Sequence, residues 1–418
     1  MKRILLLFLL MVSISFSQAR AEINLDGFLQ GLYGGRLDED NPTASEFTAS
    51  ETRMQLRAQH FGDHGQFFGR LDFTYDGAES ESQYDWELRE GYFKFRMGSK
   101  FDIKVGRQIL TWGTGDLIFI NDVFAKDYRS FFIGRDDQYL KAPQNALRIE
   151  YYSPVGALAL VWSPDFEPNR LPTGERLSFY NPMVRDIIGG ESLPSVPEPE
   201  KKFENSEFAA RLTGSVSSFS TALYFYKGFY KNPVGFDPNM GEMGSPVYPK
   251  LNVYGGSLRG QVVGGILWIE GGYFDSRQDS DGDNPYIPNS GIKGLIGFEK
   301  QVANNLTANL QWQADYMTDY DVYKVQMAGA DFIRDEVYHL LTTRWTKLLN
   351  SELITLSFFG FYSPTDEDAY LRLSASYKYT DQVNITVGGN IFDGKHKSTD
   401  FGQFMLNDNV YLKLTYGF

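Results

Sequence analysis

The last ten residues of the chain constrain its fold more than any other stretch. Apolar side chains stand at every second position: Val410, Leu412, Leu414, Tyr416 and Phe418 alternate with Tyr411, Lys413, Thr415 and Gly417. Because side chains point to alternate faces of a strand, this segment predicts a strand whose apolar face continues to the final residue. Chain ends usually fray into water, so the pattern favours a strand in a membrane wall over a buried edge strand of a soluble sheet.

Such an ending resembles the closing strand of Gram-negative outer-membrane β-barrels, which typically ends in an aromatic residue. The resemblance implies a location in the outer membrane, with its lipid and lipopolysaccharide as partners. It also implies that Tyr416 and Phe418 belong to a signal read by the barrel-assembly machinery.

The beginning of the chain has the pattern of a secretory signal peptide. Lys2 and Arg3 precede an apolar run at residues 4–12, and Ala19-Arg20-Ala21 follows a polar stretch. A basic start, a short apolar core and an A-x-A site are the parts of such a peptide. The run is shorter than the roughly 20 residues of a membrane-spanning helix, which disfavours a retained anchor. We expect residues 1–21 to be removed and residues 22–418 to form one domain.

The rest of the chain consists of short alternating segments. Only helices and closed barrels cross a membrane, because each backbone polar group needs a partner there. Segments of about ten alternating residues recur along the chain, and short and long connections alternate between them. We therefore expect an all-β fold, a transmembrane antiparallel up-and-down β-barrel of about 18 strands, with 16 as the alternative. An even count places both ends in the periplasm and the long loops outside the cell.

Composition agrees with a barrel and excludes some other classes. The aromatic content of 16% fits the girdles at the two membrane interfaces. The chain has no Cys, which excludes disulfides and thiolate metal sites, and its net charge of −13 argues against nucleic-acid binding. We expect no cofactor and no metal. In the strand that ends at Met97, Trp86 and Leu88 are out of phase with Phe93, which predicts a β-bulge.

The polar face of the strands would line a lumen that is wide enough for water at this strand count. Acidic positions on this face, among them Glu51, Asp72 and Glu270, are fewer than basic ones. The bias favours anionic or sugar-like solutes, whereas the alternative is a lattice of ion pairs that stiffens the wall. The basic residues assigned to the lumen wall are Arg53, Arg57, Arg70, Lys94, Arg96, Arg148, Arg211, Arg259, Arg344 and Arg372.

The connection at about 109–142 is the most distinctive stretch of the sequence. It is too apolar for a free loop and too charged to face lipid, so we expect it to fold into the lumen, where irregular backbone is tolerated. Charged side chains in a narrowed lumen select solutes by field and size, although the segment could equally be a structural plug. Arg107 shares the parity of the lipid-facing Val105, and Gly106 before it could allow a bulge. The candidate constriction residues are Arg107, Asp116, Asp122, Asp127, Arg129 and Arg135.

The run G-R-Q-x-x-x-W-G-x-x-D at Gly106–Asp116, followed by Asp122-Val123 and Asp127-Tyr128-Arg129, resembles a segment of large outer-membrane families. The resemblance covers residues 106–143. The families are uncharacterised porin-like barrels and, more loosely, alginate-export porins. The resemblance implies passage of solutes or polysaccharide through a pore. The usual Asn-Pro after Asp-Val is replaced here by Phe124-Ala125.

Three functions follow from these patterns. The first is a porin-like channel for passive diffusion of small hydrophilic solutes, as a monomer or a homotrimer. The second is a surface receptor or adhesin that uses the loop at 163–205 above a blocked lumen. The third is an export barrel for a polysaccharide or hydrophobic substrate. We do not expect an enzyme, because no G-x-S-x-G or H-E-x-x-H motif is present and only His339 is placed as a candidate base.

Overall fold

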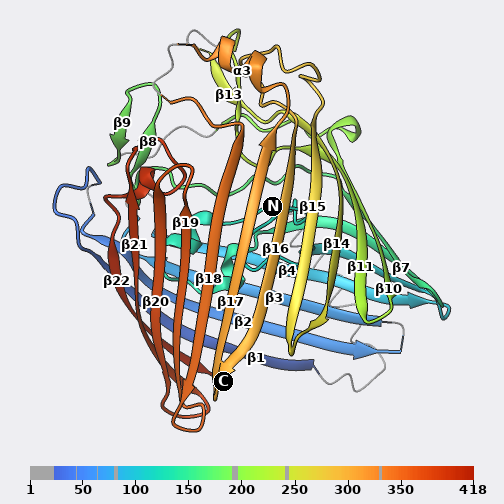
Figure 1. Ribbon diagram of the computed structural model, residues 1–418. Helices are drawn as coiled ribbons and strands as arrows, with labels where there is room; N and C mark the ends of the chain where they lie inside the picture. Colours follow the sequence, from blue (N-terminus) through green and yellow to red (C-terminus); the bar gives the residue numbers. More distant parts are fainter. Residues whose placement is uncertain are drawn as a thin grey trace.

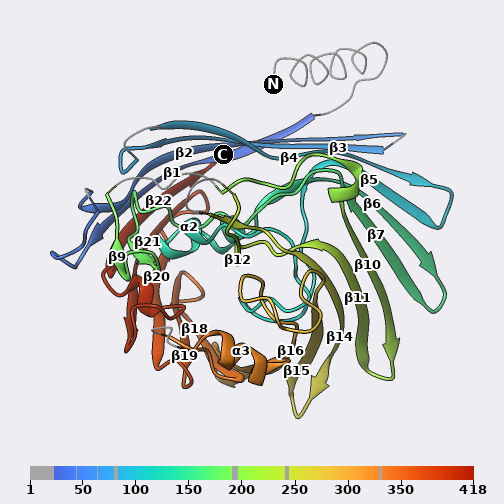
Figure 2. The same cartoon turned by 90° about the horizontal axis from the view of Figure 1, so that it is seen from above.

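A computed structural model describes residues 23–418 except 44, 64, 80–82, 191–195, 241–243 and 329–331. The predicted signal peptide lies outside these residues. One closed sheet of 18 strands forms the molecule (Figures 1 and 2). Its strands are β1 (Ile23–Arg36), β2 (Phe47–Gly62), β3 (Gly65–Asp76), β4 (Tyr84–Met97), β5 (Phe101–Ile109), β6 (Pro143–Ser153), β7 (Gly156–Ser163), β10 (Glu207–Val216), β11 (Phe219–Phe229), β14 (Lys250–Val262), β15 (Gly265–Ser276), β16 (Gly291–Ala303), β17 (Leu306–Met317), β18 (Val337–Leu349), β19 (Ile354–Ser363), β20 (Asp368–Lys378), β21 (Val383–Gly394) and β22 (Asn409–Gly417).

The barrel closes between its first and last strands. Each strand pairs antiparallel with its neighbours along the chain, and β1 also pairs with β22, with Phe28 opposite Gly417. The backbone N–H groups of Gly27 and Phe418 each donate to the carbonyl of the other, at 3.0 Å. Closure leaves no unpaired edge in the 18-stranded sheet. The predicted up-and-down barrel and its 18 strands are confirmed.

The outer wall is apolar, as the alternation predicts. The side chains of the closing strand that were assigned to lipid are 44–52% exposed on the outer surface, from Val410 to Phe418. A closed barrel with such a wall meets the requirement that a membrane sets on backbone and side chains. The chain is therefore an outer-membrane barrel. None of the helices in the described part of the chain has the length and apolar character needed to cross a membrane.

The connections are short at one end of the barrel and long at the other. The short turns, such as 98–100 and 263–264, lie at the end of the barrel where β1 begins and β22 ends. The long connections, which the sequence predicts to be the extracellular loops, carry small elements of their own. These are β8 (Phe179–Asn181), β9 (Asp186–Ile188), β12 (Gly235–Asp237), β13 (Ser245–Val247), α3 (Tyr320–Gln326), η2 (Phe203–Asn205) and η3 (Gly402–Phe404).

The loop between β7 and β10 crosses the mouth of the barrel. Its hairpin β8–β9 lies beside β21 and β22 in Figure 1, far from the strands that carry the loop. The side-chain amide of the buried Asn407 donates to the carbonyl of Ser178 at 2.8 Å, and its oxygen accepts from the Ser178 N–H at 3.0 Å. Arg176 pairs with Asp76 at 2.8 Å. The first half of this loop is therefore tied into the mouth.

The bulge predicted in β4 is present. Arg70 pairs with Glu90 and the next residue, Leu71, pairs with Leu88, so Arg89 is the inserted residue. The insertion restores the lipid-facing phase of Trp86 and turns Arg89, which is 1% exposed, into the barrel.

The segment between β5 and β6 folds into the lumen, as predicted (Figure 2). It contains the short helices α2 (Tyr128–Phe132) and η1 (Asp137–Leu140). Phe131 and Phe132 pack on wall aromatics of β19–β22, including Tyr370 with ring centroids at 5.7 and 5.4 Å. An apolar core thus lies inside the barrel rather than between stacked layers.

Candidate functional site

The inward segment, residues 110–142, meets wall cations on the side of β18–β22. Asp116 pairs with Arg344, with Oδ2 2.9 Å from Nε. Asp137 pairs with Arg372 at 2.9 Å and with Arg344 at 3.5 Å, and Asp136 pairs with Lys413. Burial raises the pKa of Asp116, an effect that the charge of Arg344 opposes. Acidic side chains of the segment therefore neutralise part of the basic wall.

Tyr139 fixes the segment to β2–β4 on the opposite side. Tyr139 is 1% exposed. Its hydroxyl donates to the carboxylate of Asp72 at 2.9 Å and accepts from the side-chain amide of Gln55 at 3.1 Å. The guanidinium carbons of Arg53 and Arg89 lie 4.1 and 4.4 Å from its ring centroid, which is cation–π distance.

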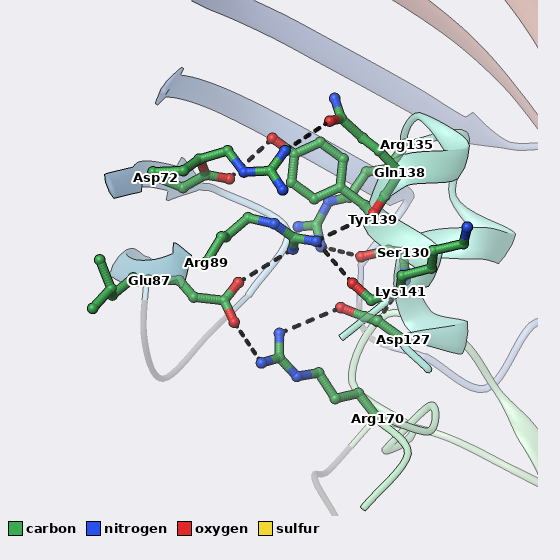
Figure 3. Close-up of polar contacts among 12 residues, drawn as sticks. Asp72, Glu87, Arg89, Asp127, Ser130, Arg135, Gln138, Tyr139, Lys141 and Arg170 are labelled. Atoms are coloured by element: carbon green, nitrogen blue, oxygen red, sulfur yellow. Dashed lines mark hydrogen bonds and ion pairs between the residues drawn. The ribbon is translucent and has the colours of Figure 1, made fainter. Parts of the chain in front are cut away.

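Arg89 also binds the backbone around η1. Its Nη2 donates to the carbonyls of Gln138 at 3.2 Å and Lys141 at 2.9 Å, and its Nη1 lies 3.4 Å from Glu87 (Figure 3). A cation near the last carbonyls of a helical turn is favourable, because those carbonyls have no partner within the turn. The bulge in β4 thus supplies the side chain that holds η1 against the wall.

A network of ion pairs continues from this wall toward the mouth. Arg170 bridges Glu87 and Asp127, and Asp127 caps α2 by accepting from the N–H of Ser130 at 2.9 Å (Figure 3). Burial raises the pKa of Asp127, but the nearby Arg129 and Arg170 outweigh that effect, so its pKa lies below the ordinary value. The carboxylate therefore stays charged in the interior.

Two polar cavities lie on either side of η1. A cavity of about 150 Å³ opens toward the long loops, since Asp76 and Asp85 at the loop ends of β3 and β4 line it. A cavity of about 450 Å³ lies toward the short turns, where Arg259 and Arg344 line it. Tyr139 lines the smaller cavity, whereas its neighbours Gln138 and Leu140 line the larger one. We call them the upper cavity and the lower cavity, and η1 is the partition between them.

The six candidate constriction residues lie in or beside the segment, in different environments. Asp122 is buried and pairs with Lys126 at 3.0 Å, so it holds the segment together while lining the lower cavity. Arg135 donates to Glu51 at 2.8 Å. Asp116 lines the lower cavity, and Asp127 and Arg129 line the upper cavity.

Arg107 points inward despite its lipid-facing parity. Its Nη2 lies 3.6 Å from Glu167 and 3.9 Å from Glu87. Gly106 before it has φ +128°, a backbone conformation that favours glycine. The pairing of β5 with β4 and with β6 continues through Gly106 without a register shift, so the bulge considered at this glycine is not present. The Arg107 Nε instead donates to the carbonyl of Leu88, beside the bulge in β4, at 2.8 Å.

The ten basic wall residues all project from the inner face, and most are paired. The pairs that do not involve the segment are Arg53–Glu51, Arg53–Asp72, Arg57–Asp26, Arg70–Glu90, Lys94–Asp102, Arg96–Asp102 and Arg148–Glu150. Within the described ranges Arg211 and Arg259 form no ion pair and instead lie over Trp112 and Trp268, at 5.4 and 5.3 Å from the ring centroids. This pairing resembles the lattice of ion pairs that the sequence allowed as the alternative to a preference for anionic or sugar-like solutes.

Several residues of the site were not among the sequence-based candidates. Arg89 faces the lumen only because of the bulge, and nothing in the sequence pointed to Tyr139 or Arg170. Asp136 and Asp137 lie in the predicted segment but were not selected.

Comparisons with known proteins show the fold. No family model matches the sequence, and a search of curated proteins gave no match. Among solved structures, OccAB4 of Acinetobacter baumannii is similar with a TM-score of 0.58 and 11% identity, covering 95% of this chain and 98% of that one. OccAB3 of the same organism gives 0.55 and 10%, covering 95% and 99%. OccD3 (OpdP) of Pseudomonas aeruginosa gives 0.54 and 10%, covering 95% and 91%. The barrel has the fold of outer-membrane porins.

Proposed function

We propose that the chain is an outer-membrane channel for passive diffusion of small hydrophilic solutes, with the inward segment as its constriction. The observation that carries the proposal is the pair of polar cavities inside one barrel, both of which η1 borders. Opposed charges on segment and wall border both cavities, as in pores that select by field and size. Both cavities lie within one barrel, so the proposal requires no homotrimer.

The lower cavity supports a preference for anionic solutes. Its three carboxylates have cationic partners, since Asp116 pairs with Arg344, Asp122 with Lys126 and Asp137 with Arg372. By contrast, the side chains of Arg259 and Lys141, which also line the cavity, form no ion pair with any residue in the described part of the chain. Uncompensated cations raise the local concentration of anions.

The structure offers less support for the other functions. A receptor that used the loop at 163–205 would present it to the medium, whereas Ser178 and Arg176 tie its first half into the mouth. Export of a polysaccharide would need the segment to leave the lumen. We expect no catalysis, since His339 lies on the lipid-facing side, stacked 5.8 Å from Trp312.

Conductance of the refolded mature chain in planar bilayers tests the proposal. We expect ion-permeable channels whose zero-current potential in a salt gradient indicates anion preference. Replacing both Arg259 and Lys141 by Gln should shift that potential toward cations, whereas Lys324→Gln on the exterior helix α3 should leave it unchanged. Absence of any conductance from a correctly folded barrel would reject the channel, and an unchanged potential in the double variant would reject the anion preference.

A further inference from the structure

Glu270 of β15 is a buried carboxylate that binds the tip of the inward segment. It is 2% exposed, and no cation of the described chain lies within ion-pair distance of it. Its Oε2 accepts from the N–H of Thr114 at 2.6 Å, the hydroxyl of Thr114 at 2.9 Å and the N–H of Gly115 at 3.2 Å. Its Oε1 accepts from the N–H and the side-chain amide of Asn121, at 2.7 and 3.0 Å. Five donors from residues 114–121 therefore converge on one side chain.

Such an arrangement makes the carboxylate and the loop depend on each other. A buried charge is costly unless it is paired or hydrogen-bonded, and here hydrogen bonds from the loop meet that need. Conversely, the backbone N–H groups of Thr114, Gly115 and Asn121 would lose their acceptors without Glu270. Bonds to an ionised acceptor are the stronger class of hydrogen bond.

Glycines allow the loop to approach the wall this closely. Gly113 has φ +81°, and a Cβ there would lie 2.8 Å from Oε1 of Glu270. On the neighbouring strand β14, a Cβ at Gly255 would overlap the side-chain oxygen of Asn121. The Trp112-Gly113-Thr114-Gly115-Asp116 run, the most distinctive motif of the sequence, thus has a matching site on the wall.

Next to this site, β17 holds the backbone of Asp116. The side-chain amide of Gln311 accepts from the Asp116 N–H at 2.8 Å and donates to the Asp116 carbonyl at 2.9 Å. The carboxylate of Asp116 is thereby directed at Arg344 across the lower cavity. The orientation of this constriction residue depends on where the loop is seated.

We propose that Glu270 is the positioning residue of the pore: it seats residues 113–121 on β14–β17 and thereby fixes the lower cavity and the Asp116–Arg344 pair. The consequence for permeation rests on the proposed channel function, whereas the seating of the loop does not.

Cysteine labelling tests the seating directly, because the chain has no Cys of its own. Ile118 is 6% exposed in the seated loop and packs in the core cluster with Leu295. The Ile118→Cys side chain should react slowly with a water-soluble maleimide in the otherwise native barrel. Adding Glu270→Gln or Glu270→Ala should raise the labelling rate at least about tenfold, since one hydrogen bond to a charged group contributes at least that factor.

Matched variants separate seating from general damage. Glu299→Gln makes the same change at an inward glutamate of β16 and should leave the labelling rate unchanged. Gly255→Ala should raise the rate without altering Glu270, whereas Gly256→Ala should not, because its Cβ would meet no atom closer than 3.5 Å. Heat-modifiable migration in gels reports a folded barrel in every case.

Two readouts distinguish the possible failures. Unchanged labelling in folded Glu270→Gln, Glu270→Ala and Gly255→Ala barrels would overturn the inference, whether or not the protein conducts. If the native barrel gave no conductance but labelling rose as expected, the channel function would fail and the seating would stand. If both hold, the same variants should show a larger conductance and a weaker ion preference than the native barrel.

Discussion

Replacing Tyr139 tests whether η1 is the partition between the two cavities. Tyr139→Ala removes the ring between the segment and β2–β4, together with the hydroxyl that binds Asp72 and Gln55. Tyr139→Phe removes only the hydroxyl and keeps the contacts with Arg53 and Arg89. The pair of variants therefore separates the ring from its polar group.

The contacts give the size of the expected effect. Each buried cation–π contact contributes about 1–2 kcal/mol, and a hydrogen bond to a charged group contributes about 1.5–3 kcal/mol. Two ring contacts and one such bond give about 3.5–7 kcal/mol for attachment of η1, an upper range because neighbouring contacts are not additive. Tyr139→Phe should lose only the hydrogen-bond part, at the low end of its range, because Asp72 still accepts from Arg53 and Gln55.

Single-channel recording provides the assay. We expect Tyr139→Ala to increase conductance, current noise and the largest polymer that enters the pore, with Tyr139→Phe close to the native barrel. Tyr92→Ala is the control, since this wall tyrosine contacts Lys104 at 3.6 Å rather than the segment. If folded Tyr139→Ala barrels conducted and excluded polymers as the native protein does, η1 would not be the partition.

Three further predictions concern assembly, pH and the core. Deleting Phe418 removes the last backbone pair with Gly27 and should lower the yield of heat-modifiable barrel in the outer membrane; an undiminished yield would contradict a role in closure. Burial raises the pKa of Asp116, so on acidification it loses its charge before an ordinary Asp and frees Arg344. Anion preference should therefore increase at a pH where ordinary carboxylates are still ionised, and Asp116→Asn should show it at neutral pH, measured from zero-current potentials. Tyr370→Ala should destabilise the barrel by about 3–5 kcal/mol, measured by denaturant unfolding in detergent, because this fully buried ring packs on the segment.

The sequence predicts the wall well because a wall strand has a simple physical rule. Lipid outside and water inside impose a period of two, so parity alone places Arg53 and Arg372 on the inner face. The same rule detects the bulge in β4 through the shifted phase of Trp86. Composition and charge likewise place the inward segment, since no other environment suits a stretch that is both apolar and charged.

Contacts between segment and wall are not encoded in any local pattern. Glu270 is recognisable as an inward carboxylate, but its partners lie about 150 residues earlier in the chain. The inward and outward alternation of a strand does not apply to Tyr139, because this residue belongs to a short helical turn in the lumen. Such contacts depend on where the chain path crosses the barrel, and sequence periodicity contains no information on that path.

The attachments of the segment differ in how easily solutes and salt can disturb them. Phe131 and Phe132 are held by apolar contacts in a fully buried cluster, which dissolved ions do not weaken. The Asp116–Arg344 pair is 27–28% exposed on the two side chains, so mobile ions screen it more than they screen buried pairs. If anions pass through the barrel as we propose, the edge of the segment at the lower cavity is the part that they would displace, by competing with Asp116 for Arg344. It follows that high salt should reduce ion preference at this edge while leaving the aromatic anchor, and with it the fold of the lumen, intact.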